Sequence, residues 1–348
     1  MQPAASQGPN AATALTSDIT QGERLVLFPA AASLAPGGQA WIIPVHAWVY
    51  VPQNSRIRRA AIAALLKAQH GLDVTKAAEP TFDERVNLLL ADNKRGRRIV
   101  VEIAGVRHVL PATGPNGHAV TDIRVSGSPS STPGQPTVIK AILPIGDTRV
   151  ITTVIQFIPP KGLSVISDID DTVKITHVTD RKRMWQSTFY APFEAVPGMA
   201  EAYQRLAKAN DASFHYLSSS PWHLAEPLLR FMADAALPLS SISLKHIRLK
   251  DRTALNIVSP GRHTKPPAIA QILAQFPERT FILIGDSGED DPEVYAAAMR
   301  ANPGRIAHIY IRNVTQARRD DVRFSATFAG IAPQHWNLFD DPGVIRAP

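Results

Sequence analysis

The sequence of 348 residues contains no cysteine and few aromatic residues (7%). The lack of cysteine excludes disulfides and thiolate metal sites. No hydrophobic run is long enough to span a membrane, and residues 1–20 are small and polar, without the apolar core of a signal peptide. We therefore expect a disordered N-terminus over residues 1–20 and a cytoplasmic protein that can contact a membrane only peripherally.

The charged residues are unevenly balanced. Lys and Arg number 37 against 30 for Asp and Glu, a net charge of +7, and the isoelectric point is about 9.7. This excess favours an anionic partner, which includes a membrane surface, a phosphoester and nucleic acid, and it does not choose among them. The length suggests two domains, each with enough apolar residues for an ordinary core.

The first expected domain, residues 21–158, has mostly strand patterns. Residues 40–51, 97–103 and 149–158 are rich in β-branched and aromatic residues, and one helix over 56–70 interrupts them with Ser55 as its cap. We predict a β-sandwich-like accessory domain. Paired acids and phosphate loops do not occur in it, so docking or stability is the expected role.

From residue 159 to residue 348 strand and helix patterns alternate, which is typical of a parallel sheet with helical crossovers. The first strand of this domain is predicted within LSVISDIDDTVK, residues 163–174. Three carboxylates, Asp168, Asp170 and Asp171, follow its apolar run. Because ligands bind at the carboxyl ends of such strands, crowded acids there predict a pocket with a bound cation. Oxygen ligands favour Mg²⁺.

Two later segments offer groups that can bind a phosphoryl oxygen. The strand pattern ASFHYLSSSP, residues 212–221, ends in serines, of which Ser218 comes first. Lys265 precedes two prolines that suit a first helical turn, and a lysine there can neutralise a nucleophile and a phosphate. Lys250 is the alternative lysine.

Another strand pattern, TFILIGDSGEDDPEVY over residues 280–295, is followed by acids. Gly285 is expected to allow a sharp turn after the strand. Asp286, together with Asp290 or Asp291, offers carboxylates to a metal, and Pro292 opens a helix. The four segments together are far more specific than any one of them.

DIDDT resembles the nucleophile motif of the haloacid dehalogenase superfamily. Within this superfamily, the chain resembles most the phosphatidate phosphatase family named for an actin patch protein. This resemblance covers roughly residues 160–320 and rests on the segments SDIDDTVKIT, YLSSSPW and LIGDSGEDDPEVY. The resemblance implies a Rossmann-like α/β domain and Mg²⁺-dependent hydrolysis of phosphatidate to diacylglycerol. The gaps of 50 residues from Asp168 to Ser218 and of 47 residues from Ser218 to Lys265 leave little room for a cap domain. The implied site residues are the nucleophile Asp168, the acid/base Asp170, the phosphate binders Ser218 and Lys265, and a metal site drawn from Asp168, Asp170, Asp286, Asp290 and Asp291.

Other functions remain open at this point. The domain could hydrolyse another phosphomonoester, including a nucleic-acid end, although no stacking module for single strands is evident and nucleic acid is not the expected partner. It could instead be a non-catalytic scaffold on anionic membranes. The segment RKRMW, residues 181–185, joins three cations to Met184 and Trp185, and we predict that it contacts such a membrane.

Overall fold

The computed structural model describes residues 15–127, 137–245 and 264–348. These residues form two compact units, Met1–Val51 with Asn93–Phe157, and Pro52–Asp92 with Ile158–Pro348. One division falls between residues 157 and 158, next to the boundary expected between residues 158 and 159. Residues 52–92, which we had placed in the accessory domain, group with the second unit.

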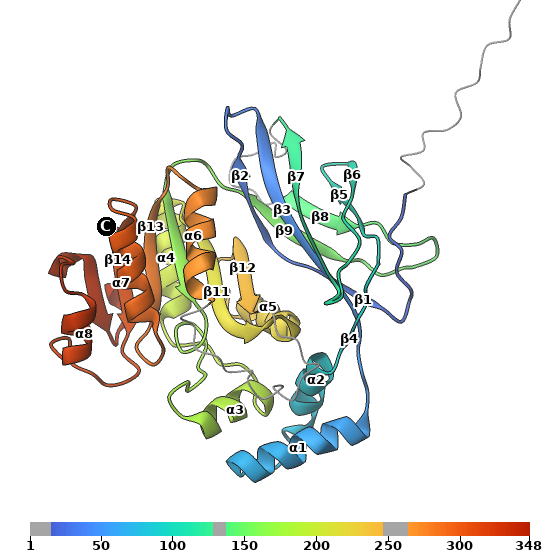
Figure 1. The fold of residues 1–348 in the computed structure, drawn as a ribbon, viewed down its shortest axis with the longest axis horizontal. Helices are drawn as coiled ribbons and strands as arrows, with labels where there is room; N and C mark the ends of the chain where they lie inside the picture. Colours follow the sequence, from blue (N-terminus) through green and yellow to red (C-terminus); the bar gives the residue numbers. More distant parts are fainter. Residues whose placement is uncertain (1–14, 128–136, 246–263) are drawn as a thin grey trace, which may run out of the picture. The chain divides into compact units, whose positions relative to one another are not determined.

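The first unit is mainly β, as predicted (Figure 1). Neighbouring strands are hydrogen-bonded in the order β1-β3-β2-β9-β8-β5-β6, and β7 also pairs with β3. The sandwich arrangement stays a prediction. The bounds are β1 (Arg24–Leu27), β2 (Ala30–Leu34), β3 (Ala40–Val51), β5 (Val100–Ile103), β6 (Val106–Val109), β7 (His118–Ser126), β8 (Thr137–Ala141) and β9 (Thr152–Phe157). The two-residue β4 (Asp92–Asn93) pairs with β3 as well.

Alternation along β3 builds the core of this unit. Ile43, Val45 and Ala47 point inward and are almost fully buried, as the period of two in a strand requires. Ile19 joins the same core, and the backbone of Ser17 is bonded to Ile142. Residues 15–20 are therefore ordered, and the expected disorder is wrong for them because Ile19 buries apolar surface; residues 1–14 lie outside the described residues.

The second unit contains a six-stranded sheet in the order β12-β11-β10-β13-β14-β15, and every neighbouring pair is parallel. This confirms the α/β class. All six residues of β10 are buried, as expected for a strand that is covered on both faces of a parallel sheet. The bounds are β10 (Leu163–Asp168), β11 (Ser213–Pro221), β12 (Ser241–Lys245), β13 (Thr280–Asp286), β14 (Ile306–Arg312) and β15 (Trp336–Phe339).

Helices connect these strands. They are α4 (Met199–Asn210), α5 (Ala225–Asp234), α6 (Lys265–Gln275), α7 (Asp291–Ala301) and α8 (Val322–Thr327). Lys265 is the first residue of α6, directly before Pro266 and Pro267, as the sequence predicted. The chain order of the strands reverses between β10 and β13, and such a reversal marks the ligand crevice of an open parallel sheet.

A helical layer formed by α1 (Arg56–His70), α2 (Glu79–Leu89) and α3 (Arg181–Phe189) also belongs to this unit (Figure 1). Helix α1 has the predicted bounds, and Ser55 accepts a hydrogen bond from the Arg58 amide. Leu66 and Phe82 pack against Trp185 and Phe189 in one apolar cluster. Because Met184 and Trp185 are buried in this cluster, the prediction that they face a membrane is wrong.

One buried arginine bonds α2 to the end of α3. The Arg85 guanidinium donates to the carbonyl oxygens of Ser187, Thr188 and Ala191, and lies 3.7 Å from the centre of the Phe193 ring. These carbonyls would otherwise lack partners at the helix end. Residues 52–92 thus supply the support of α3, although they lie about a hundred residues earlier in the chain.

Candidate active site

The candidate active site lies at the carboxyl ends of β10 and β13, where the strand order reverses. Asp168 is the last residue of β10, Asp286 the last of β13, and Asp291 the first of α7. All three side chains are buried. The sheet therefore brings together acids that are separated by more than a hundred residues in the sequence.

Lys265 lies among these acids. Its ammonium is 2.8 Å from Asp168 Oδ1, forms a second ion pair with Asp291, and is 3.5 Å from Glu289. Burial alone would lower the pKa of Lys265, but the attraction of Asp168 and Asp291 outweighs burial and raises it above its usual range. Lys265 is thus a fixed positive charge beside Asp168.

The acids outnumber the lysine. Burial raises the pKa of Asp168 well above its ordinary value, and Lys265 only partly opposes this rise. Burial and the neighbouring Asp291 act in the same direction on Asp286, whose pKa is also raised. The group therefore carries uncompensated negative charge whenever all its members are ionised.

These three carboxylates fit a metal ion. One ligand atom from each of Asp168, Asp286 and Asp291 lies within 4.8 Å of the others. Asp286 Oδ2 is buried and has no hydrogen-bond partner among the described residues, so it is available as a ligand. Of the five acids suggested from the sequence, Asp170 and Asp290 lie outside this group.

Asp290 and Gly285 differ from expectation for related reasons. Asp290 is the N-terminal cap position of α7, and the turn of the helix brings Asp291 back to β13 instead. A Cβ atom on Gly285 would be 2.8 Å from the Asp291 Cβ. Gly285 lacks the left-handed φ that a glycine turn would show, so it provides room for Asp291 and the predicted sharp turn is wrong.

Asp170 belongs to a separate polar network. Its carboxylate is 2.7 Å from the Lys174 ammonium and accepts hydrogen bonds from the hydroxyls of Ser218 at 2.7 Å and Ser220 at 3.1 Å. Burial would raise the pKa of Asp170, but Lys174 and the hydroxyls of Ser218 and Thr176 outweigh burial and lower it to about 2. Lys174 was not identified from the sequence; a cation four residues after Asp170 was the available signal.

The third acid of the motif, Asp171, shapes the loop that follows. Asp171 has a left-handed φ of 53°, and its carboxylate accepts from the amides of Thr176 at 2.7 Å, His177 at 2.9 Å and Val178 at 2.6 Å. Three amide donors on one carboxylate hold the loop in place. The acids of this motif thus have different surroundings: Asp168 belongs to the buried acidic cluster, and Asp171 holds the loop beside it.

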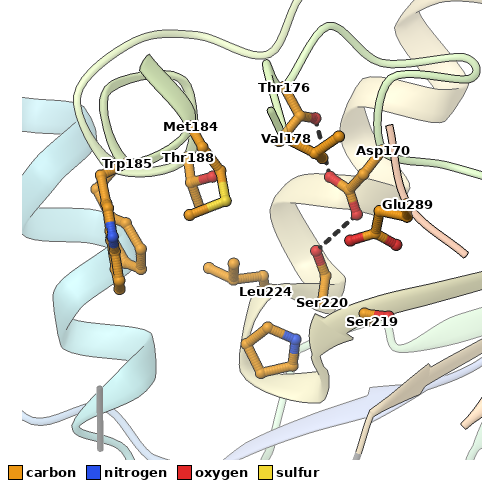
Figure 2. A pocket seen from close by; sticks show the side chains of 12 residues that line it. Asp170, Thr176, Val178, Met184, Trp185, Thr188, Ser219, Ser220, Leu224 and Glu289 are labelled. Carbon is orange, nitrogen blue, oxygen red and sulfur yellow. Dashed lines mark hydrogen bonds between the residues drawn. The ribbon is translucent and has the colours of Figure 1, made fainter. Parts of the chain in front are cut away.

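A pocket opens between this polar network and α3, and Figure 2 shows its lining. Asp170, Ser220 and Glu289 lie on one side of the view, Met184 and Trp185 lie on the other, and Leu224 lies between them. Ser219 also lines the pocket, and its buried hydroxyl has no hydrogen-bond partner among the described residues. The pocket therefore has a polar side, with carboxylates and hydroxyls, and an apolar side.

Glu289 is a site residue that the sequence analysis missed. Burial raises its pKa to about 7, with Lys265 opposing the rise. It lines the pocket near Asp170 (Figure 2), and its carboxylate is 3.5 Å from the Lys265 ammonium. The GEDD sequence contained it, but one-dimensional spacing cannot show which acid of such a run turns inward. Lys250, the alternative to Lys265, lies outside the described residues.

The fold and the site define an α/β enzyme domain with a buried lysine and an acidic cluster suited to a metal. Residues 163–313 match the family model described as the catalytic domain of phosphatidate phosphatase APP1. This segment belongs to that family of phosphatases, and the family prediction is confirmed.

Two curated relatives each match a little less than half of the chain. Phosphatidate phosphatase APP1 of Saccharomyces cerevisiae is 35% identical over 168 residues, which are 47% of this chain and 28% of the relative. An uncharacterised protein of Schizosaccharomyces pombe is 35% identical over 157 residues, 44% of this chain and 25% of the relative. The match thus spans about a quarter of these relatives.

Among solved structures, a candidate beta-phosphoglucomutase from Thermotoga maritima aligns with 52% of this chain and 95% of its own, at 12% identity. Its TM-score of 0.32 is too low to carry an argument about the fold. Among the described residues, no helix is long and apolar enough to cross a membrane.

Proposed function

We propose that this protein is a Mg²⁺-dependent phosphatidate phosphatase with a fold of the haloacid dehalogenase type. The main support is that the buried Lys265 forms ion pairs with Asp168 and Asp291 within the segment that matches the family model. The substrate is suggested by the name of the yeast relative. Mg²⁺ is suggested by the hard oxygen ligands of the acidic cluster.

In this proposal Asp168 is the nucleophile. One of its carboxylate oxygens forms a bond to phosphorus while the bond from phosphorus to the leaving oxygen breaks, which gives an aspartyl phosphate. Lys265 lowers the negative charge that the attacking carboxylate presents to the phosphate. Asp168, Asp286 and Asp291 would hold the metal, which supplies further screening of charge when bound.

Asp170 is proposed as the acid and base. It passes a proton to the leaving alkoxide, and then accepts a proton from the water that hydrolyses the aspartyl phosphate. With its pKa near 2, Asp170 is ionised at neutral pH in this structure. A bound phosphate would place negative charge beside it and raise this pKa, so that substrate binding itself would favour the protonated form.

We propose the residues that bind the phosphate from their positions in the site. Lys265 stays the proposed cationic binder because it is fixed at the nucleophile. The Ser218 hydroxyl bonds to Asp170 in this structure, so binding a phosphate oxygen would require it to exchange partners. Ser219 has an unused hydroxyl in the same pocket and is a second candidate.

The apolar side of the pocket supports a lipid substrate over a small polar one. Met184 and Trp185 lie across the pocket from Asp170, where the leaving group would extend (Figure 2). Apolar contact there stabilises a hydrocarbon part and gives a charged sugar or nucleotide nothing to bond. A different phosphomonoester remains the second candidate, because the polar half of the site recognises phosphate alone.

Phosphate release tests this proposal. We expect release from phosphatidate vesicles in the presence of Mg²⁺, loss of release with EDTA, and slower turnover of a polar phosphomonoester such as glycerol phosphate. Asp168→Asn should bind vesicles as the parent protein does and release no phosphate. Turnover of glycerol phosphate but not phosphatidate would contradict the substrate, and turnover undiminished by EDTA would contradict the metal.

A further inference from the structure

Helix α1 buries one face and leaves a second apolar face exposed. Ile62, Ala63 and Leu66 pack toward the apolar cluster shared with α2 and α3. Residues three and four apart on the opposite side are apolar as well. The exposed set is Ile57, Ala60, Ala61, Ala64, Leu65 and Ala68.

This exposure is unusual for the larger members of the set. Ile57 is 84% exposed and Leu65 is 36% exposed, while Leu66 beside it is 1% exposed. A surface helix that only covers a core needs one apolar stripe and carries polar residues opposite. The second stripe of α1 is therefore not required by the packing of this unit.

Cations flank the exposed stripe along its length. Arg56 and Arg58 lie on either side of Ile57 at the start of α1 and are exposed. At its other end, the Lys182 ammonium of α3 lies near Gly71, where a Cβ would be 3.8 Å from it, and Arg181 is exposed beside Lys182. None of these four cations has an ion pair within the described part of the chain.

We propose that the exposed face of α1, with the cations at the start of α3, is the surface on which this protein docks on anionic lipid bilayers. Apolar residues between flanking cations are the pattern of a helix that lies in a membrane interface. The charge is complementary to anionic headgroups. The 15 residues of α1 span about 22 Å, enough for several lipid headgroups.

The position of this docking surface is consistent with the proposed function. Its biological use rests on that function. The cluster that holds α1 and α2 contains Met184, Trp185 and Phe189, and the same three side chains line the pocket beside Asp170. A bilayer under α1 would thus lie against the helical layer that forms the apolar wall of the candidate active site. Docking there would keep a lipid substrate close to its pocket.

Vesicle flotation tests the surface separately from catalysis. The probe is phosphatidylcholine vesicles containing phosphatidylserine, which is not a phosphomonoester, with pure phosphatidylcholine as the neutral comparison. We expect the full chain to bind the anionic vesicles. Arg56→Ser with Arg58→Ser should weaken binding roughly thirtyfold, since each cation contributes on the order of a factor of five. Ile57→Glu should weaken it further.

Matched controls lie on other exposed surfaces of the same unit. Arg205→Ser with Lys208→Ser removes two exposed cations from α4, and Val322→Glu places a charge at an 86% exposed valine. These controls should bind as the parent does. Turnover of a soluble phosphomonoester should be unchanged in all variants, because none of these residues belongs to the candidate active site.

The outcomes separate the two proposals. The docking surface is overturned if the α1 variants bind vesicles as the parent does. It is also overturned if the α4 control loses as much vesicle binding as the α1 variants, or if Ile57→Glu loses turnover of the soluble phosphomonoester. Self-association that Ile57→Glu abolishes, without any effect on vesicles, also overturns it in favour of an interface between copies. Intact, α1-dependent vesicle binding without phosphatase activity would support the surface and overturn only the proposed function.

Discussion

At the scale of single residues, the site depends on one lysine balancing several buried acids. Lys265 contacts Asp168 and Asp291 at once, and both partners are buried. A charge of this kind is costly to remove because its partners are left unpaired in a poorly solvated place. Catalysis and stability are therefore coupled at this position.

Replacing Lys265 by Ala should lower kcat/KM for a soluble phosphomonoester by at least about a thousandfold, since transition-state charge in a dry site is worth a few kcal/mol. It should also destabilise the metal-free protein by roughly 3 kcal/mol. Activity assays and thermal melts with and without Mg²⁺ measure both effects. Near-normal turnover of this variant would show that another cation neutralises the nucleophile and the phosphate, and Lys250 would be the first candidate.

Asp168→Asn should abolish turnover without unfolding the protein. The substitution removes the proposed nucleophile and also one charge from a crowded acidic group. Because burial already raises the pKa of Asp168, the metal-free variant should melt no lower than the parent protein. Measurable Mg²⁺-dependent turnover by Asp168→Asn would rule out the covalent mechanism.

Glu289 predicts a pH dependence of stability. The carboxyl titrates near its ordinary value of 4.5 when unfolded and near 7 when folded, so between these values the folded protein holds a proton that the unfolded chain has lost. The free energy of unfolding of the metal-free protein should therefore fall as pH rises from about 4.5 to about 7.

Glu289→Gln should remove this part of the pH dependence, whereas Glu201→Gln, at an exposed position on α4, should leave it unchanged. Denaturant unfolding at several pH values in EDTA measures the difference. Equal pH profiles for Glu289→Gln and the parent protein would show that folding does not shift the pKa of this carboxyl.

At the scale of elements, α3 depends on α2 for its position. The Arg85 guanidinium bonds three carbonyl oxygens at the end of α3 and contacts the Phe193 ring. Helix α3 in turn supplies the apolar wall of the pocket. A change on α2 should therefore reach the site through α3.

Arg85→Met should keep the apolar volume and lose the hydrogen bonds, with a loss of stability of roughly 2–3 kcal/mol. Because α3 would loosen, KM for phosphatidate should rise more than kcat falls. Steady-state kinetics and limited proteolysis around residues 181–190 measure these effects. The exposed Arg230, replaced by Met, serves as control, because its ion pair with Glu84 is at the surface. Unchanged proteolysis in Arg85→Met would contradict the dependence.

At the scale of the whole molecule, the catalytic unit is discontinuous in sequence. Residues 52–92 leave the first unit between β3 and β5 and pack with residues 158–348. Without them, Trp185, Phe189 and Tyr190 would lose their apolar partners. The matched family segment, 163–313, does not include these residues.

A chain of residues 158–348 alone should therefore be less stable than the full chain and should bind hydrophobic dyes through the uncovered α3. A chain that deletes only the first unit and joins residues 52–92 to 158–348 by a flexible linker should recover most of the stability. Thermal melts and dye fluorescence compare the three. If residues 158–348 alone are as stable as the full chain, α1 and α2 are dispensable for folding.

Most of the catalytic half was predictable because its signals are local. A buried strand followed directly by acids, as at Asp168 and Asp286, needs only a parallel sheet to bring those acids to one edge. The lysine before two prolines was placed at the start of α6 for the same reason. Periodicity and strand ends are properties of short segments, so one dimension suffices for them.

Only the tertiary structure decided what depends on distant contacts. The spacing between motifs left little room for a cap, yet helical cover comes from residues 52–92, outside those spacings. The tertiary structure also placed Asp291, and not Asp290, in the acidic cluster, brought Glu289 to Lys265 and Lys174 to Asp170, and buried Trp185. Each of these results depends on which side of an element meets another element, and that follows from packing, which short segments of sequence do not determine.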